Sequence, residues 1–384
     1  MSMVLKRSWL ALLGLAIVLT GCSLASGTEC VDEPGSSCLW AGTGETGLNG
    51  DGHDMLETQF YWPEDIEFGP DGTPWILDWN NHMVRRVLSD GTVETVVGDF
   101  VGDGPPDQSD LAPPGAPGRT VRLNHPTDIE FAPDGTMYLA AWHNHKIRRI
   151  DPETGLVMVA AGRGPGFEGD GGPFEEALLD QPKAIDFGPD GTMYILDQRN
   201  QRIRKVSGVD GTITTVVGTG EAGYSGDGGP PRQAQLNFDT GPNPNPSGAL
   251  VLGPDGALYV ADALNYRIRR VDFDKDVIET IAGAGTKGFS GDGGPATAAQ
   301  ISAVADMEFG PDGRLYIADT GNNCVRAIDP DTGNIEMVWN GDGDSPGLKG
   351  RRRYLNSPMG IAFDQDGHLY IADTFNSRII RLAL

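Results

Sequence analysis

Short apolar runs of four to six residues alternate with polar turns along most of this chain, and they recur in groups of four. In one group the runs cover residues 184–187, 193–196, 202–206 and 212–217, and the turns between them are rich in Asp, Asn and Gly. An Asp-Gly pair separates the first two runs, where glycine supplies the positive φ that a tight hairpin turn requires. The pattern predicts four short antiparallel strands in each group.

The groups repeat along the whole chain. The Asp-Gly pair recurs at 71–72, 134–135, 190–191, 255–256, 312–313 and 366–367. Six groups of four strands predict an all-β fold, a six-bladed β-propeller with four-stranded antiparallel blades. The last group ends at Leu384 after its third run, whereas residues 38–44 match the fourth run of another group, at 281–285. We therefore expect an N-terminal strand to complete the sixth blade and close the ring without an open sheet edge.

The turn between the second and third runs carries a family resemblance. It reads Asp-Trp-Asn-Asn-His-Met-Val-Arg at 78–85, and the segments 197–204 and 262–269 share its Asp, Asn and Arg. This turn resembles the NHL repeat, and all six groups within residues 38–384 fit it, with departures at Ala141, Cys324 and Ile380. We expect the repeated Asp and Arg, such as Asp197 and Arg204, to join neighbouring turns. The resemblance implies the fold and leaves the function open.

The N-terminus has the order of an export signal. Lys6 and Arg7 precede an uncharged apolar run at 9–19, and Leu-Thr-Gly-Cys follows at 19–22. The run is too short for a stable membrane span. The segment resembles a bacterial lipobox, which implies a signal peptide at 1–21, a lipidated Cys22, a tether at 22–37 and a propeller at 38–384. Ser23 after the cysteine favours the outer membrane over the inner one in a bacterial cell envelope.

The acidic composition limits the classes of partner that the chain can bind. The formal net charge of −25 argues against nucleic acid and against an anionic lipid surface, which both require a basic face. We expect a monomer that touches the membrane through its lipid anchor only. In an oxidising compartment Cys30 and Cys38, which are close in sequence, are candidates for a disulfide, and Cys324 would remain a free thiol.

Acidic residues recur on the first strand of several groups. Asp65, Asp128 and Asp306 occupy one position of this strand, and two residues further on stand Glu67, Glu130, Asp186 and Glu308. Alternation places both positions on one side of the strand, so a ring of such strands predicts an acidic central channel. Asp65, Asp128 and Asp306 are candidate oxygen ligands for Ca²⁺ or Mg²⁺.

Aromatic residues gather in the turns that precede the third runs. These turns contain Trp79, His82, Trp142, His143 and His145, and the arc continues with Arg199 and Tyr266. Exposed tryptophan beside carboxylates suits sugar rings or peptide side chains. The alternative is that the tryptophans pack between blades and that the acids pair with Arg or Lys.

Three loops share the sequence Gly-Asp-Gly-Gly, at 169–172, 226–229 and 291–294. We expect their aspartates to cap the short helical turn that follows, in preference to binding calcium, which needs several oxygens from one loop.

Two functions remain. The first is a non-catalytic binding or scaffolding module that holds a protein, peptide or glycan. The alternative is a divalent-metal-dependent lyase or lactonase, because amidating lyases, streptogramin lyases and gluconolactonases share related six-bladed folds. In the amidating lyases zinc-binding histidines follow the proline that opens inner strands. None of the matching positions here is histidine: they hold Glu64, Thr127, Lys183, Gly248, Ala305 and Met359. His125 stands directly before such a proline. We therefore favour binding over catalysis.

Overall fold

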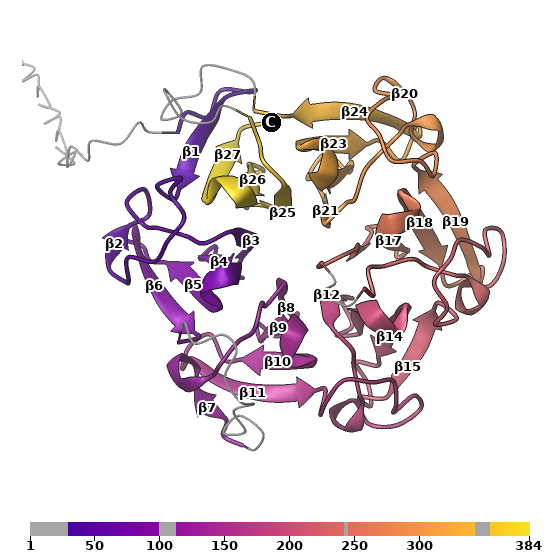
Figure 1. Ribbon diagram of the computed structural model, residues 1–384, viewed down its shortest axis with the longest axis horizontal. Helices are drawn as coiled ribbons and strands as arrows, with labels where there is room; N and C mark the ends of the chain where they lie inside the picture. Colours follow the sequence, from indigo (N-terminus) through magenta and orange to yellow (C-terminus); the bar gives the residue numbers. More distant parts are fainter. Residues whose placement is uncertain (1–29, 100–112, 242–244, 342–353) are drawn as a thin grey trace, which may run out of the picture.

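The computed structural model describes residues 30–99, 113–241, 245–341 and 354–384, which form six antiparallel sheets around a central axis (Figure 1). The ring confirms the predicted all-β six-bladed propeller. Cys22, the predicted signal peptide and the first part of the tether lie outside the described residues. Within the described part of the chain, no helix has the length and apolar character needed to cross a membrane.

Each blade contains four strands, and three blades carry a short fifth strand at the outer edge. Blade 1 has β3 (Pro63–Phe68), β4 (Pro74–Asp78), β5 (Met83–Val87) and β6 (Thr92–Val97), with β2 (His53–Asp54) outside. Blade 2 has β8 (Asp128–Phe131), β9 (Met137–Ala141), β10 (Lys146–Ile150) and β11 (Leu156–Ala161), with β7 (Ala116–Pro117) outside. Blade 3 has β12 (Pro182–Phe187), β13 (Met193–Asp197), β14 (Arg202–Val206) and β15 (Ile213–Val217).

The remaining blades follow the same order. Blade 4 has β16 (Ala249–Leu252), β17 (Leu258–Asp262), β18 (Arg267–Asp272) and β19 (Val277–Ala282). Blade 5 has β21 (Asp306–Phe309), β22 (Leu315–Asp319), β23 (Cys324–Ile328) and β24 (Asn334–Trp339), with β20 (Gly294–Pro295) outside. Blade 6 has β25 (Pro358–Phe363), β26 (Leu369–Asp373), β27 (Arg378–Leu382) and, from the other end of the chain, β1 (Ser37–Ala41).

Short 3₁₀ turns mark one face of the ring. One joins the second and third strands of each blade: η1 (Trp79–Asn81), η3 (Trp142–Asn144), η5 (Gln198–Asn200), η7 (Ala263–Asn265), η9 (Thr320–Asn322) and η10 (Thr374–Asn376). We call this the top face, and the face with the Asp-Gly turns the bottom face. Four more 3₁₀ turns lie in the loops between blades: η2 (Gly118–Thr120), η4 (Phe174–Glu176), η6 (Pro231–Gln233) and η8 (Ala296–Ala298).

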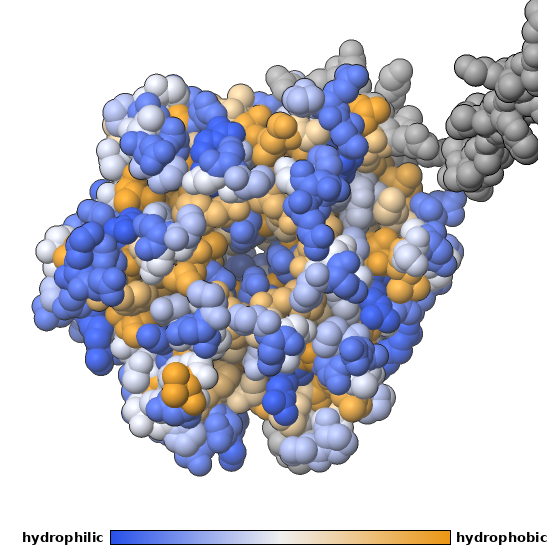
Figure 2. All heavy atoms as spheres, turned by 180° about the vertical axis from the view of Figure 1, so that it is seen from behind, coloured by the Kyte–Doolittle hydropathy of each residue, from blue (hydrophilic) through white to orange (hydrophobic). Residues whose placement is uncertain are grey.

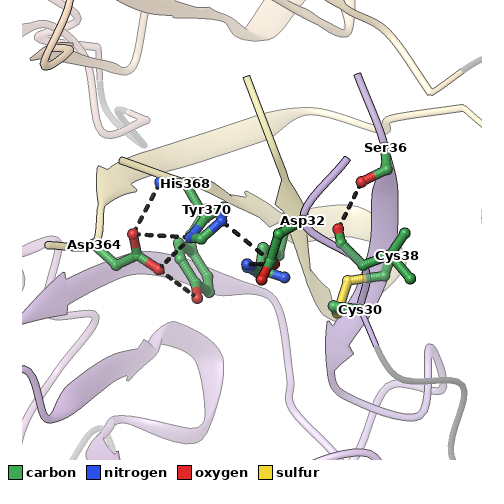
Figure 3. Close-up of a disulfide and its surroundings, with 9 residues drawn as sticks. Cys30, Asp32, Ser36, Cys38, Asp364, His368 and Tyr370 are labelled. Atoms are coloured by element: carbon green, nitrogen blue, oxygen red, sulfur yellow. Dashed lines mark hydrogen bonds and ion pairs between the residues drawn. A yellow bond between two sulfur atoms is a disulfide. The ribbon is translucent and has the colours of Figure 1, made fainter. Parts of the chain in front are cut away.

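The two ends of the chain meet in blade 6, as the sequence predicted. β1 pairs antiparallel with β27, with Cys38 opposite Arg381 and Leu39 opposite Ile380, and Figure 1 shows the indigo β1 beside the yellow β27. A disulfide joins Cys30 to Cys38 just before and within β1. Hydrogen bonds between β1 and β27 therefore close the last blade, and the disulfide ties the segment before β1 back to that strand (Figure 3).

The hydrophobic core is divided among the blade interfaces. Each of the six interfaces holds its own cluster of buried side chains. Between blades 3 and 4, for example, Leu196 and Ile203 meet Leu258 and Val260, all of them fully buried. Because alternate residues of a strand point to opposite faces, the middle strands are buried on both sides, which explains their continuous apolar runs.

The repeated Asp and Arg form a buried clamp at each of several turns. The Asp197 carboxylate accepts hydrogen bonds from the backbone N–H of Asp180 at 2.8 Å, from Asn200 at 2.8 Å and from Arg204 at 3.2 Å. Both members of the ion pair are fully buried. Equivalent pairs join Asp78 to Arg85, Asp262 to Arg269 and Asp319 to Arg326. In blade 6, where Ile380 replaces the clamp arginine, Asp373 pairs with Arg378 instead, two residues earlier on the strand. The prediction that these residues join neighbouring turns is confirmed.

The prediction that the Gly-Asp-Gly-Gly aspartates cap a helical turn is wrong. No side-chain capping bond is present at η4, η6 or η8. Asp170, Asp227 and Asp292 instead bind the buried arginines of the same clamps, with N–O distances of 2.6 to 2.8 Å. A fully buried guanidinium needs more acceptors than one carboxylate offers, and this demand overrides the local capping preference.

Candidate functional site on the top face

The repeat serves as an internal control for the top face, because a role filled in every blade belongs to the fold. His82 Nδ1 accepts the backbone N–H of His125 at 3.0 Å, and His145 Nδ1 accepts that of Gln181 at 3.2 Å. In blade 5 the side-chain oxygen of Asn323 accepts the backbone N–H of Ser357 at 2.7 Å in the same way. Two predicted ligand-binding residues, His82 and His145, thus join one blade to the next.

Three further predicted ligand-binding residues lie in different settings and do not form one site. Trp142 is 1% exposed and donates its indole N–H to Gln198 at 3.0 Å, so it packs between blades 2 and 3 as the alternative interpretation had it. Tyr266 is half-buried in the αL position that His82 and His145 occupy in their own blades. Arg199 is exposed on η5, away from any ring contact in the described residues.

The structure brings other rings together into a continuous arc over blades 6, 1 and 2. Neighbouring centroids lie 4.5 to 6.2 Å apart along the series Phe375, Trp62, Trp79, His125 and His143. Phe375 is 39% exposed, and the other four side chains are partly exposed. We call these five residues the aromatic arc. Trp79 and His143 were predicted site residues, whereas Trp62 and Phe375 were not found from the sequence.

Backbone conformation indicates that the fold does not demand these rings. Trp62 and His125, each followed by a proline, have φ values of 58° and 49°. Gln181 and Ser357 occupy the same αL position in blades 3 and 6, with φ values of 54° and 51°. This region is unfavourable for bulky residues, and polar or small side chains satisfy it elsewhere in the ring. Trp62 and His125 are therefore candidates for function.

The predicted acidic channel is present along the axis. A cavity of about 200 Å³ is lined by seven carboxylates: Asp65, Glu67, Asp128, Glu130, Asp186, Asp306 and Glu308. Figure 2, from the side opposite to Figure 1, shows a central hollow with hydrophilic atoms at its depth. Blades 4 and 6 contribute apolar residues such as Val251 and Ala362, so the acidic wall is incomplete.

The upper channel carboxylates connect adjacent blades. Asp65 accepts the backbone N–H of Ile129 at 3.1 Å, and Asp306 accepts that of Ile361 at 2.8 Å. Asp128 accepts the backbone N–H of Ile185 at 2.6 Å in the same arrangement. Each bond runs from one inner strand to the next, so these side chains contribute to ring closure.

Lys183 places a positive charge among these groups. Its Nζ lies 3.6 Å from Glu64 Oε1 and donates to the carbonyl oxygen of Thr127 at 3.4 Å. Burial alone would lower the Lys183 pKa, but the facing carboxylates of Glu64, Asp128 and Asp306 raise it above its ordinary value. The three predicted metal ligands, Asp65, Asp128 and Asp306, thus interact electrostatically with an ammonium group. Their binding of Ca²⁺ or Mg²⁺ stays a prediction.

Among the residues that the structure describes, the charged neighbours of the deeper carboxylates are other carboxylates. Burial and mutual repulsion raise the pKa values of Glu67, Glu130 and Glu308 well above the usual range. Burial raises the pKa of Asp186 to about 6. The lower channel therefore holds protons more firmly than exposed carboxylates do.

One further group of potential metal ligands lies in blade 6. Asp364, Asp366 and His368 bring their ligand atoms within 4.8 Å of one another. Asp364 already accepts hydrogen bonds from His368 Nδ1 at 3.0 Å and Tyr370 at 3.0 Å, and from two backbone N–H groups. His368 Nε2 in turn lies 3.4 Å from Asp32, which also pairs with Arg381. Figure 3 shows how this network ties the N-terminal segment to blade 6, which accounts for it structurally.

A larger hollow of about 670 Å³ lies between blades 4 and 5, lined by Tyr259, Arg270 and Phe309 among others. Arg270 is held by Asp255 at 2.7 Å and by Asp272 at 3.4 Å. Because these charged side chains already pair with one another, the hollow offers a ligand fewer hydrogen-bonding groups than the top face does.

Comparisons with known proteins agree with the propeller fold. The family model for the NHL repeat matches residues 355–382. The chain is a six-bladed β-propeller that contains an NHL repeat. It is 28% identical over 282 residues to the Arabidopsis thaliana protein SUPPRESSOR OF QUENCHING 1, chloroplastic, covering 69% of this chain and 24% of that protein. It is 29% identical over 258 residues to Teneurin-m of Drosophila melanogaster, covering 63% of this chain and 9% of that protein.

Solved structures share the fold at low identity. An auxiliary nutrient binding protein from Bacteroides thetaiotaomicron superposes with a TM-score of 0.61 and 14% identity, covering 90% of this chain and 75% of the other. Since the chain spans under a quarter of the two sequence relatives named above, their whole-protein activities do not transfer to it.

Proposed function

We propose that this propeller is a non-catalytic binding module that holds a neutral glycan on the aromatic arc of its top face. The observation that carries the proposal is the unbroken series of partly exposed rings from Phe375 to His143, at positions where the other blades hold different residues. The rings stand on the top face of three adjacent blades, at positions that differ in the other blades. Such a local change on a repeated fold is typical of a scaffold that carries one specific binding site.

The chemistry of the arc favours sugar rings among the ligands considered above. Indole and phenyl faces pack against the apolar C–H face of a pyranose, while nearby amides and imidazoles bind hydroxyl groups. Asn80 and Asn124 lie beside His125, with side-chain oxygens 3.1 and 2.8 Å from its ring nitrogens. The net charge of −25 disfavours acidic glycans.

The alternative of a metal-dependent lyase or lactonase receives less support. It needs Asp65, Asp128 and Asp306 to bind a divalent ion, yet these carboxylates accept backbone hydrogen bonds and face Lys183. An ion at that position would have to compete with the ammonium charge. Binding without catalysis therefore accounts for more of the observed contacts.

We further propose that the chain is exported and anchored in a bacterial envelope through a lipid on Cys22. The disulfide between Cys30 and Cys38 supports an oxidising compartment. The disulfide also attaches Cys30 to β1 of blade 6. In this proposal the segment 22–29 therefore connects the propeller to the membrane.

A glycan array tests the binding proposal. The fluorescently labelled chain should bind a subset of neutral oligosaccharides, and Trp62→Ala should weaken the tightest interaction at least tenfold, about 1.4 kcal/mol. Val209→Ser is the matched control, because Val209 is 93% exposed in a bottom-face turn of blade 3. Binding that is equal in both variants would overturn the assignment of the site. A chain that binds peptides but no glycan on the array would contradict the assignment of a glycan ligand.

A further inference from the structure

We infer that His125 and His143 form a binding site for a borderline divalent cation, such as Zn²⁺ or Co²⁺, on the top face. Their Nδ1 atoms lie 3.0 Å apart, although the residues come from the loop before β8 and from η3. Two tetrahedral ligands at about 2.0–2.1 Å from zinc are about 3.3 Å apart. The pair therefore needs to open by only a few tenths of an ångström to hold an ion.

Neighbouring groups orient His125 as a ligand. Its Nε2 lies 3.1 Å from Asn80 Oδ1, an acceptor, so in the tautomer with hydrogen on Nε2 this nitrogen donates to Asn80 and Nδ1 is the nitrogen that binds an ion. A metal-bound histidine usually donates the hydrogen of its second ring nitrogen to a fixed oxygen in this way. Asn124 Oδ1 lies 2.8 Å from the same Nδ1. The side-chain oxygen of Asn124 and the Nδ1 atoms of His125 and His143 therefore converge at hydrogen-bonding distance, and an ion would take the place of the proton that they share.

His143 is supported from below. Its ring stacks on Trp142, with centroids 4.0 Å apart and an interplanar angle of 23°. Trp142 is itself 1% exposed and bonded to Gln198. The imidazole plane is thus held by a side chain that cannot move without disturbing the interface of blades 2 and 3, which is the rigid support that a metal ligand requires.

The repeat does not require a histidine at the position of His143. The residue that matches His143 is Asn80 in blade 1, Arg199 in blade 3 and Leu264 in blade 4. By contrast, His82 and His145 perform the inter-blade bond that other residues perform elsewhere. Imidazole nitrogens select zinc, cobalt, nickel or copper over calcium and magnesium. The inference is therefore separate from the channel carboxylates and does not depend on the glycan.

The proposed protein ligands leave one coordination position of the ion open. His125, His143 and the side-chain oxygen of Asn124 supply three donors, and zinc sites with three protein ligands accept an outside ligand at the fourth position. An ion held here would lie beside the aromatic arc, where Trp79 is 4.5 Å from the His125 ring.

Titration of the full-length chain in detergent, stripped with EDTA, with CoCl₂ and ZnCl₂ tests the inference. We expect one ion per chain, tetrahedral Co²⁺ absorption that Zn²⁺ displaces, and at least tenfold weaker binding in His125→Ala and in His143→Gln. His143→Gln keeps a side chain on Trp142, so it remains informative if His125→Ala does not fold. His53→Ala is the matched control, because it removes one imidazole from β2 on the outer edge of blade 1.

Three results would overturn the inference. They are the absence of stoichiometric Co²⁺ binding, binding that survives both histidine variants, and binding that is lost in Asp306→Asn, which would move the ion into the channel. Glycan binding plays no part in these readouts, so the metal site and the proposed function can fail independently.

Discussion

Replacing Arg204 by methionine should destabilise the ring far more than replacing Arg202, two residues earlier on β14. Arg204 is fully buried and binds Asp197 at 3.2 Å, Asp170 at 2.8 Å and the carbonyl oxygens of Leu178 and Glu168. Methionine fills much of the volume but leaves the Asp197 carboxylate buried without its cation. Breaking a buried pair by removing one partner costs about 3–5 kcal/mol.

Arg202 provides the matched control. Both guanidinium groups lie over the ring of Phe167, at 4.0 Å for Arg202 and 4.7 Å for Arg204, so this contact is lost in either variant. Arg202 is partly exposed and otherwise binds two carbonyl oxygens, of Asn200 and Thr219. We expect Arg202→Met to cost less than about 1 kcal/mol.

Urea unfolding at pH 7.5, followed by tryptophan fluorescence and by circular dichroism, measures the difference. Coincident transitions at both probes would justify a two-state free energy. The pKa of Asp197 is raised by burial to about 6 even with the arginine present. Its protonation in Arg204→Met should therefore make the loss smaller at pH 5 than at pH 7.5. Equal losses in the two variants would refute the structural role assigned to the clamp.

Further predictions concern the channel and the N-terminus. Burial and the neighbouring Asp65 raise the pKa of Asp306 from 3.8 to about 7, so the folded chain binds this proton more tightly than the unfolded chain. Stability should rise as the pH falls from 7 toward 4, and urea midpoints in Asp306→Asn should vary less with pH; a midpoint that rises with pH would contradict this. Burial raises the pKa of Glu64 to about 8 even beside Lys183, so Lys183→Met should destabilise the chain more at pH 9 than at pH 6, where Glu64 is neutral; adding Glu64→Gln should recover part of the loss at pH 9 in a double-mutant cycle. Cys30→Ser should cost about 2–3 kcal/mol, as expected for opening a short covalent loop; an unchanged thermal midpoint would argue against it. Cys22→Ser should move the chain from the detergent phase to the aqueous phase in Triton X-114 partitioning and abolish labelling by radioactive palmitate, whereas persistent labelling would place the lipid elsewhere.

The sequence predicted the fold well because the blade is a local unit. Hairpin turns with Asp-Gly, such as that at 190–191, fix strand order over about 40 residues, and the missing fourth strand at Leu384 points directly to residues 38–44. The acidic channel followed from alternation on the inner strands. These inferences needed only the period of the pattern.

The top-face site was harder to predict, because its residues lie in different blades. His82 and His145 look like binding residues in the sequence, but their repeated bond to the next blade is visible only in three dimensions. Trp62 precedes a proline in a loop, and Phe375 stands some 310 residues away in the last blade. Their contact at 4.9 Å depends on ring closure. The available signal was the departure of Trp62 from the small or polar residues at its position in other blades.

The central claim is that the aromatic arc binds the ligand, and hydrogen–deuterium exchange with and without the tightest glycan from the array tests it most directly. We predict slower exchange in the segments 61–62, 79–82, 124–125, 142–145 and 374–377, which carry the arc and its supports. The bottom-face turns at 71–73, 134–136 and 190–192 should exchange at unchanged rates. Protection confined to those bottom turns, or to the outer strands of blades 3 to 5, would contradict the account.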